Sequence, residues 1–211
     1  MTGKRLTSAL ILITFSSGLL YTAAENIKVE FVKSKVHFHS DMIEEKTRIS
    51  AGNSLGQNGR LETGRNSEIL VLFSGDLRMY MPSDSAVSYK TGTDTVLIIP
   101  ETGSFALLND RKSGKKAEVL LPSHILSMTE GELSVFGNPS ILAVYQGTVY
   151  VVEKTSGFET YVGKGQFTTL FSGRQPAISL HLDRLTQPNP NHNRIIQIFK
   201  MLNILRRQKD N

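Results

Sequence analysis

The sequence predicts an all-β fold, a solenoid-like or sandwich stack of short strands that is followed by a C-terminal amphipathic helix. Three observations support this fold class. Short apolar segments, several with strict alternation, fill residues 27–171. Glycine or proline separates them at the intervals of about 8–12 residues that are typical of sandwiches, barrels and β-solenoids. No stretch of this region keeps helical periodicity over three turns.

The individual strands follow from their patterning. Residues 27–31 and 35–39 alternate apolar and polar, which predicts half-buried strands. The continuous apolar run 69–73 predicts burial on both faces, whereas alternation in 77–81 predicts one buried face. The intervening glycines are predicted to supply positive φ at tight turns. Further strands are predicted at residues 96–99, 104–108, 117–121, 125–128, 133–136, 141–145, 148–152, 158–162 and 167–170.

One insert interrupts this series. Residues 109–116 (NDRKSGKK) are polar, charged and glycine-containing, and they lie between two apolar runs. This composition predicts an exposed hairpin loop. A cationic loop can contact an acidic partner, but a solvated turn is the more common outcome.

The N-terminus carries an export signal. Residues 1–24 begin with the basic pair Lys4 and Arg5, continue with an apolar stretch and end in small residues, which is the layout of a secretory signal peptide. A membrane anchor is the alternative, but it requires about 20 strongly apolar residues, and this stretch is interrupted by serine, threonine and glycine. In either case we expect the rest of the chain to be periplasmic or secreted.

Composition excludes several classes of site. The 211 residues are enough for one domain with appendages. The chain has no cysteine, which excludes disulfides, thiolate metal sites, a thiol nucleophile and a cysteine lipid anchor.

The distribution of charge is also informative. Without Lys4 and Arg5 the formal charge of +5 falls to +3. Residues 174–211 carry seven Lys/Arg against two Asp, a net +5, so residues 25–173 carry −2. Because phosphate binding needs clustered cations on the folded surface, we do not expect nucleic acid to be a partner.

The C-terminal part changes character. We expect a β domain at 25–174, a linker at 175–193 that contains Pro188 and Pro190, and a basic amphipathic helix at 194–209. The apolar positions of this helix follow helical spacing: Ile195, Ile198, Phe199, Leu202 and Leu205. Three interpretations remain open for it. The helix can lie on an anionic membrane surface, dock into a groove of a partner, or fold back over an open edge of the β domain.

Residues 51–80 resemble the FecR domain family. The shared features are Gly52-Asn53, Leu55, Gly59, Thr63-Gly64, and Ser67 before the strand 69–73, with Ser74-Gly75-Asp76 where the family often has an Asp-Gly-Ser turn. The strand, glycine turn and strand of residues 143–152 and the Gly-Gln pair at 165–166 resemble the closing half of the family. Together the resemblance covers about residues 27–171.

This resemblance implies a role in signalling. Members of the family include inner-membrane regulators whose exported part receives a signal from an outer-membrane receptor, while a short cytoplasmic helical region controls a sigma factor. Only residues 1–5 precede the hydrophobic segment here, so we expect the exported module without that cytoplasmic region. The matching residues are turn and strand positions, and they transfer no catalytic or binding role.

One possible metal site was considered. His37 and His39 are two apart, so on a strand they share a face, and Asp41 continues it. No certain fourth ligand or supporting shell is evident, so a solvated strand end is the favoured interpretation. A metal-dependent hydrolase that uses these three residues is the enzymatic alternative.

Other chemistry is less well supported. Ser123 and His124 are adjacent, and on a strand such neighbours face opposite ways. Two acid pairs, Glu44-Glu45 and Glu130/Glu132, are interpreted as solvated turn-edge residues rather than glycosidase carboxylates. The glycine-rich residues 52–64 lack the Lys-Ser/Thr and helix of a phosphate loop. The tyrosines can stack on sugars if exposed, although cross-strand packing is more common: Tyr80, Tyr89, Tyr145, Tyr150 and Tyr161.

The sequence therefore assigns no catalytic, cofactor-binding or metal-ligating residue. It predicts a non-catalytic extracytoplasmic module that binds or senses an envelope protein or polysaccharide. An envelope scaffold that assembles through strand edges is the structural alternative.

Overall fold

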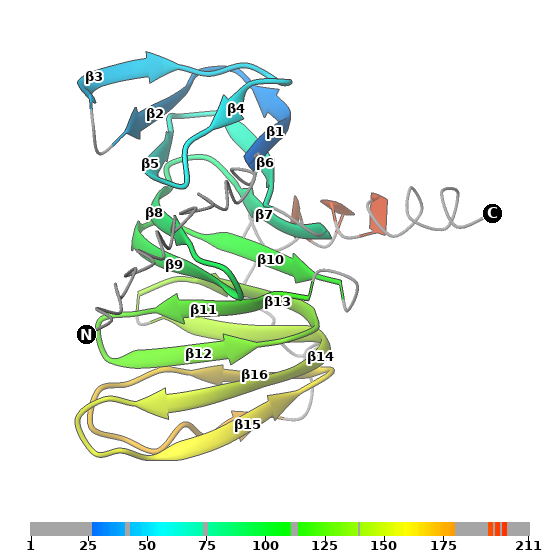
Figure 1. Cartoon of the computed structure of the whole chain (residues 1–211). Helices are drawn as coiled ribbons and strands as arrows, with labels where there is room; N and C mark the ends of the chain where they lie inside the picture. The colour runs from blue at the N-terminus through cyan, green and yellow to red at the C-terminus, as the bar shows by residue number, and fades with distance from the viewer. Residues whose placement is uncertain are drawn as a thin grey trace, which may run out of the picture.

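The computed structural model of the chain describes residues 27–40, 43–73, 76–110, 114–138, 140–179, 194–195, 197–198 and 200–201. Its β-strands form two ladders that share one long strand, β14 (Figure 1). The all-β prediction is confirmed. The predicted signal peptide, Asp41, and the end of the predicted helix beyond residue 201 lie outside the described residues.

Within the described residues, the first ladder, sheet A, contains nine strands. In spatial order they are β4 (Ser54–Leu55), β1 (Ile27–Lys33), β6 (Glu68–Leu72), β7 (Leu77–Met81), β10 (Phe105–Asn109), β13 (Gly131–Phe136), β14 (Ile141–Glu153), β16 (Gln166–Thr169) and β17 (Ile178–Ser179). All these pairings are antiparallel. Strand β17 lies in the stretch that was predicted to be a linker.

The second ladder, sheet B, also contains nine strands. In spatial order they are β3 (Ile43–Arg48), β2 (Val36–Ser40), β5 (Asn58–Thr63), β8 (Ala86–Thr91), β9 (Thr95–Thr102), β11 (Lys116–Leu120), β12 (His124–Met128), β14 and β15 (Glu159–Gly163). Among these pairings only β9 with β11 is parallel. Figure 1 shows the strands stacked from β3 at one end to β15 at the other.

The core lies between the two sheets. Alternate residues of each strand point inward, and they form one cluster that includes Val71 and Leu107 from sheet A and Leu61 and Val151 from sheet B, all fully buried. This is the face-to-face packing of a sandwich. Val29, Val36 and Met79, which alternation in the sequence assigned to buried faces, belong to this cluster.

Strand β14 differs from the prediction of two strands, 141–145 and 148–152, that are separated by a turn. It is one strand whose first half pairs with β13 and β16 in sheet A and whose second half pairs with β12 and β15 in sheet B. Gly147 has a φ of 77° and lies opposite Gly131. The glycine bends the strand from one sheet into the other without ending it.

Gly59 was predicted to supply a positive φ at a turn, and this is wrong. It lies inside β5, and a Cβ at this position would be 2.2 Å from the ring of Phe38. The missing side chain makes room for an aromatic ring of the neighbouring strand.

Candidate partner-binding surfaces

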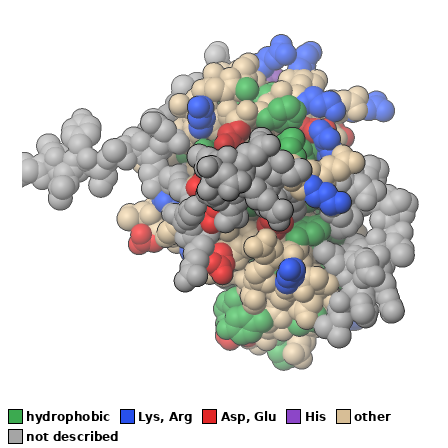
Figure 2. All heavy atoms as spheres, turned by 90° about the vertical axis from the view of Figure 1, so that its right-hand side faces the viewer, with side chains coloured by type: hydrophobic (Ala, Val, Ile, Leu, Met, Phe, Trp, Pro, Cys, Tyr) green, Lys and Arg blue, Asp and Glu red, His purple; other side chains and the backbone are tan. Residues whose placement is uncertain are grey.

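One end of the sandwich exposes large apolar side chains. We call this surface the aromatic end and define it by Phe158, Tyr161, Phe171 and Ile178, whose exposed fractions are 43%, 64%, 47% and 37%. These residues lie on or next to β15, β16 and β17, the last strands of both ladders. Figure 2 shows hydrophobic side chains gathered at this lower end. Exposed apolar groups in such a cluster mark interaction sites.

A pair of tyrosines forms part of this surface. Tyr150 on β14 and Tyr161 on β15 are opposite each other, and their ring centroids are 5.0 Å apart. A hydrogen bond with Glu159 raises the pKa of Tyr150 to about 12. Cross-strand packing, the favoured fate of these tyrosines, is therefore observed, but Tyr161 still presents most of its surface to solvent.

A buried carboxylate holds the aromatic end together. Glu153 is the last residue of β14, and its Oε2 accepts hydrogen bonds from the Thr155 amide at 3.0 Å, the Ser156 amide at 2.5 Å and the Ser156 hydroxyl at 2.6 Å. Its other oxygen, Oε1, accepts one from the amide of Gly173 at 3.0 Å. The Ser156 hydroxyl is the main cause that lowers the pKa of Glu153 to about 2.

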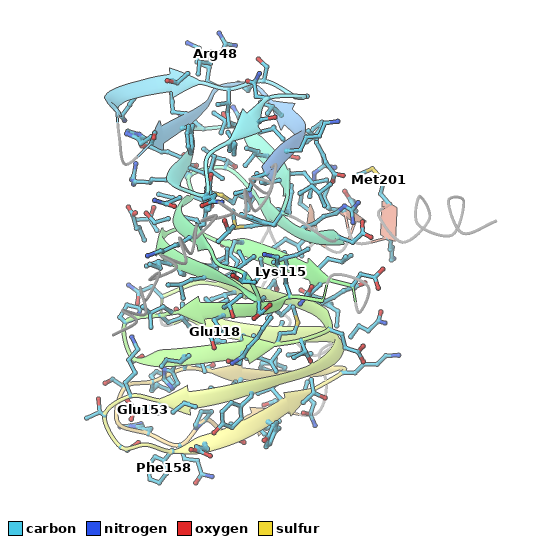
Figure 3. The ribbon with its side chains drawn as sticks, in the orientation of Figure 1. Arg48, Lys115, Glu118, Glu153, Phe158 and Met201 are labelled. Carbon is cyan, nitrogen blue, oxygen red and sulfur yellow. The ribbon has the colours of Figure 1, made fainter. Side chains whose placement is uncertain are left out.

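These bonds link loops from both sheets. The amide of Glu153 also donates to the carbonyl of Phe158, so one residue fixes the loop before β15 and the loop after β16. Figure 3 shows Glu153 and Phe158 at the same end of the molecule. The side chain of Arg174 lies 5.9 Å from the ring centroid of Phe171. The exposed Phe158 and Phe171 thus lie in loops that these hydrogen bonds hold in place.

The prediction that Ser123 and His124 face opposite ways is wrong. Strand β12 begins at His124, so Ser123 is not extended, and its Oγ lies 2.8 Å from Nδ1 of His124. The imidazole is nevertheless fully buried, and Nε2 has no hydrogen-bond partner among the residues that the structure describes. The nearby Glu153 bonds to loop amides and a hydroxyl. This is not the arrangement in which a carboxylate orients a catalytic histidine.

We predict that His124→Phe reduces the loss of stability on mild acidification. Burial, assisted by Lys154 and opposed by Glu153, lowers the pKa of His124 below 6.5. The unfolded chain then binds the proton more readily, so stability falls as the pH drops below 6.5 toward the folded-state pKa. Urea unfolding at pH 7.5 and pH 5.5 measures the difference, and a wild-type slope in the variant would contradict it.

The metal candidate is only partly described. His37 and His39 share the outer face of β2, as predicted, and Asp41 lies outside the described residues. His39 Nε2 is 3.6 Å from Glu62 Oε2, and Glu62 also accepts from Arg60 at 2.7 Å and Lys46 at 3.2 Å. The described residues contain no group of three metal-ligating side chains.

The acid pairs are placed differently from the prediction of solvated turn edges. Glu44 and Glu45 lie within strand β3. Glu132 is buried in β13, with 6% exposed, whereas Glu130 is exposed in the turn before that strand. The prediction of solvation is therefore wrong for Glu132.

The 109–116 insert is not a hairpin loop, because it crosses from β10 in sheet A to β11 in sheet B. Asn109, Asp110 and Lys115 are buried, whereas Gly114 is exposed. The side-chain amide of Asn109 donates to the carbonyls of Lys115 at 2.8 Å and Thr129 at 2.8 Å, and the Lys115 ammonium donates to Gly92 at 2.6 Å. A cavity of about 630 Å³ lies beside it, lined by Asp94, Gly114, Lys115, Lys116, Thr129 and Glu130.

The remaining tyrosines have structural roles. The hydroxyl of Tyr89 donates to the carbonyl of Gly56 at 2.9 Å, and its ring packs edge-on against Phe73. Tyr80 was predicted to face solvent, but it is only 1% exposed. Together with Leu70, Ala106 and Leu108 it forms an apolar face on the outside of sheet A.

The C-terminal helix covers that face. Residues 194–195, 197–198 and 200–201 are helical, and Ile195 and Ile198 pack against the outside of sheet A beside β7 and β10 (Figure 1). Arg194 donates to Glu68 Oε2 from NH2 at 2.9 Å and from Nε at 3.1 Å. Of the three interpretations of the helix, folding back is the one observed, over a face rather than an edge.

No helix in the described part of the chain is both long and apolar enough to span a membrane. Among the functional features, Glu153 was missed by the sequence interpretation. The signal that points to it is an acidic residue at a strand end followed by Lys-Thr-Ser-Gly, because turn amides and a serine hydroxyl there can converge on a carboxylate.

Similar folds are known. Two crystal structures of a proposed anti-sigma factor from Parabacteroides distasonis ATCC 8503 match with TM-scores of 0.50, at 14% and 12% identity. Each match covers 58% of this chain and 59% of that chain, so the chain spans about three fifths of their length. No family model matches the sequence. No curated protein matches it either. At this identity, the similarity concerns the fold alone.

Proposed function

We propose that the chain is a non-catalytic, extracytoplasmic module of the FecR-like kind that binds a cell-envelope protein or polysaccharide in a signalling process. The aromatic end carries this proposal, because it exposes four large apolar side chains, of which Phe158 and Phe171 lie in loops that Glu153 holds by hydrogen bonds. The fold shared with a proposed anti-sigma factor supports a signalling role. The N-terminal sequence supports export.

A protein is the favoured partner class. Sugar binding typically uses a flat aromatic platform, whereas this surface combines two phenylalanines, a tyrosine and an isoleucine. Among the described strands, β15 pairs only with β14, so its other edge can accept an extended segment. An envelope protein that supplies both an apolar contact and a strand fits these features.

We predict that Tyr161→Ser abolishes partner capture while it lowers stability by at most about 1.5 kcal/mol, the contribution of the lost ring contact with Tyr150. The side chain is 64% exposed, so its loss removes contact area from the partner and little from the core. Co-purification from cells, together with urea unfolding of the isolated variant, measures the two effects. A variant that captures the partner as well as wild type does would exclude the aromatic end.

The test of the site uses a photo-crosslinking amino acid in the full chain in cells. It replaces Tyr161 in one strain and the exposed Arg48, at the opposite end of the sandwich, in another (Figure 3). We expect one envelope protein to be crosslinked from position 161 and not from position 48. Equal capture from both positions, or none from 161, would overturn the proposal. Mass spectrometry of the exported chain tests export, for which the N-terminus should follow Ala24.

The unpaired edge of β15 also favours a second candidate, an envelope scaffold. A scaffold that assembles through strand edges predicts concentration-dependent oligomers of the full chain even when no other envelope component is present. Light scattering of the purified full chain over a range of concentrations distinguishes it from the signalling module.

A further inference from the structure

The apolar outer face of sheet A is formed by strands whose positions do not depend on the helix that covers it. We call Leu70, Tyr80, Ala106 and Leu108 the helix-binding face. They alternate along β6, β7 and β10 with residues such as Val71, Met79 and Leu107, whose side chains belong to the main core. Because the inward side chains fix these strands, the helix-binding face keeps its shape when no helix is present.

The helix fits this face through a short motif. Ile195 and Ile198 are three residues apart, so they lie on the same side of the helix, and they are 0% and 5% exposed. Arg194 precedes them and pairs with Glu68, whose other oxygen accepts from Lys33 at 3.1 Å. Burial opposes ionisation of Glu68, but the bonds from Arg194 and Lys33 prevail and lower its pKa. Among the described residues of the helix, Arg194, Ile195 and Ile198 therefore make the contact with the face.

The described contact of the helix is small. It consists of two isoleucines and one ion pair between side chains that are 40% and 11% exposed. In proteins most helical stability comes from tertiary packing of an apolar face, so this helix depends on the helix-binding face for its stability.

The connecting segment is long. Residues 180–193 join β17 to the first helical residue. An extended chain spans up to about 3.3–3.6 Å per residue, so these fourteen residues can reach roughly 46–50 Å. The helix can therefore reach the same face on a neighbouring molecule.

We propose that two copies of this chain exchange their C-terminal helices, each helix occupying the helix-binding face of the other copy. The occupant is the same segment that the structure shows bound in one chain, so every described contact is retained. Reciprocal exchange is a twofold-symmetric arrangement and a low-cost route to a dimer. A tethered helix has a high effective concentration at its own face, so dimers form where the chain is concentrated.

Charge exchange in the full chain tests this proposal. Glu68→Arg and Arg194→Glu each place like charges at the contact within one molecule. When the two variants are mixed, each helix finds an opposite charge only on the other chain. We expect mixing to give a one-to-one heterodimer in native mass spectrometry, about tenfold more abundant than the dimers of either variant alone. The double variant Glu68→Arg/Arg194→Glu should behave like wild type.

A matched control and a second measurement make the result specific. Lys200→Glu makes the same charge change on an exposed position of the helix, and its mixture with Glu68→Arg should give no heterodimer. If Glu68→Arg does not fold, fluorescence energy transfer between labelled copies of the chain is measured instead. The chain has no cysteine, so a single introduced cysteine can be labelled specifically. A donor on Met201→Cys and an acceptor on Arg48→Cys of another copy should show transfer that Ile195→Asp/Ile198→Asp abolishes.

Two results would overturn helix exchange. Mixed charge variants that remain monomers, while the double variant is restored, would show that the helix binds only its own chain. Dimers that persist in Ile195→Asp/Ile198→Asp would show association through strand edges. Neither result depends on crosslinking from Tyr161, so these experiments test helix exchange independently of the proposed partner-binding function.

Discussion

Replacing Gly147 with alanine should destabilise the protein by roughly 2–5 kcal/mol, since a left-handed backbone costs about 1–2 kcal/mol for alanine and a forced contact about 1–3 kcal/mol. Gly147 has a φ of 77°, and a Cβ there would be 2.4 Å from the carbonyl oxygen of Glu130. This close contact can be relieved only if the turn before β13 moves. Urea unfolding with a linear extrapolation measures the loss.

Gly165 is the matched control. Its φ of 76° is nearly the same, but a Cβ there would meet nothing within 4 Å. Gly165→Ala should therefore cost only the backbone term of about 1–2 kcal/mol. Equal losses in the two variants would mean that the close approach of β13 and β14 is not what requires glycine at 147.

The second large effect concerns acid stability, which Glu153→Gln should change. The hydrogen bonds of Ser156 and Gly173 to the carboxylate lower its pKa from 4.5 to about 2. A carboxylate with a lower pKa in the folded state stabilises the fold above the unfolded pKa, and this contribution is lost as the pH falls from 4.5 toward 2. The variant should be less stable at pH 7 and should lose less stability across that window.

Thermal unfolding between pH 7 and pH 2.5 measures both parts of this expectation. Asp94→Asn, an exposed carboxylate in a turn, is the control and should follow the wild-type profile. A Glu153→Gln variant that is as stable as wild type at pH 7 would show that the neutral amide replaces the carboxylate in this loop. The aromatic end would then not depend on a buried charge.

Much of the fold was predictable because alternation reports directly on which residues enter the core. Val29, Val36 and Met79 were placed correctly by this rule. Tyr80 was not, because burial of its side of β7 depends on a helix more than a hundred residues later in the chain. The alternation of residues within one strand carries no information about a helix that packs on that strand from so far along the chain.

Strand β5 shows a second limit. Its sequence, NGRLET, has one large apolar residue and a glycine, so no strand was predicted there. The strand forms because β2 and β8 pair with its two edges and because Phe38 occupies the space above Gly59. Pairing and close contact, which depend on other strands, outweighed low local β-propensity.

The candidate sites were predictable to a smaller extent. Residue types indicated only that tyrosines of this sheet more often pack across strands than bind sugars, and the structure shows Tyr150 and Tyr161 in such a contact. Which tyrosine remains exposed depends on β15 being the last strand of its ladder, a property of the finished topology. Glu153 was missed for the same reason, since Gly173 joins it only when both sheets are assembled.

Because a single backbone, that of β14, belongs to both ladders, the two layers of the sandwich are connected by covalent bonds as well as by side-chain packing. Tension applied to the β15 side passes along this strand into the opposite layer without first having to break a lateral hydrogen bond. The layers are thus unable to slide apart independently. The body should respond to a mechanical load as one stiff unit.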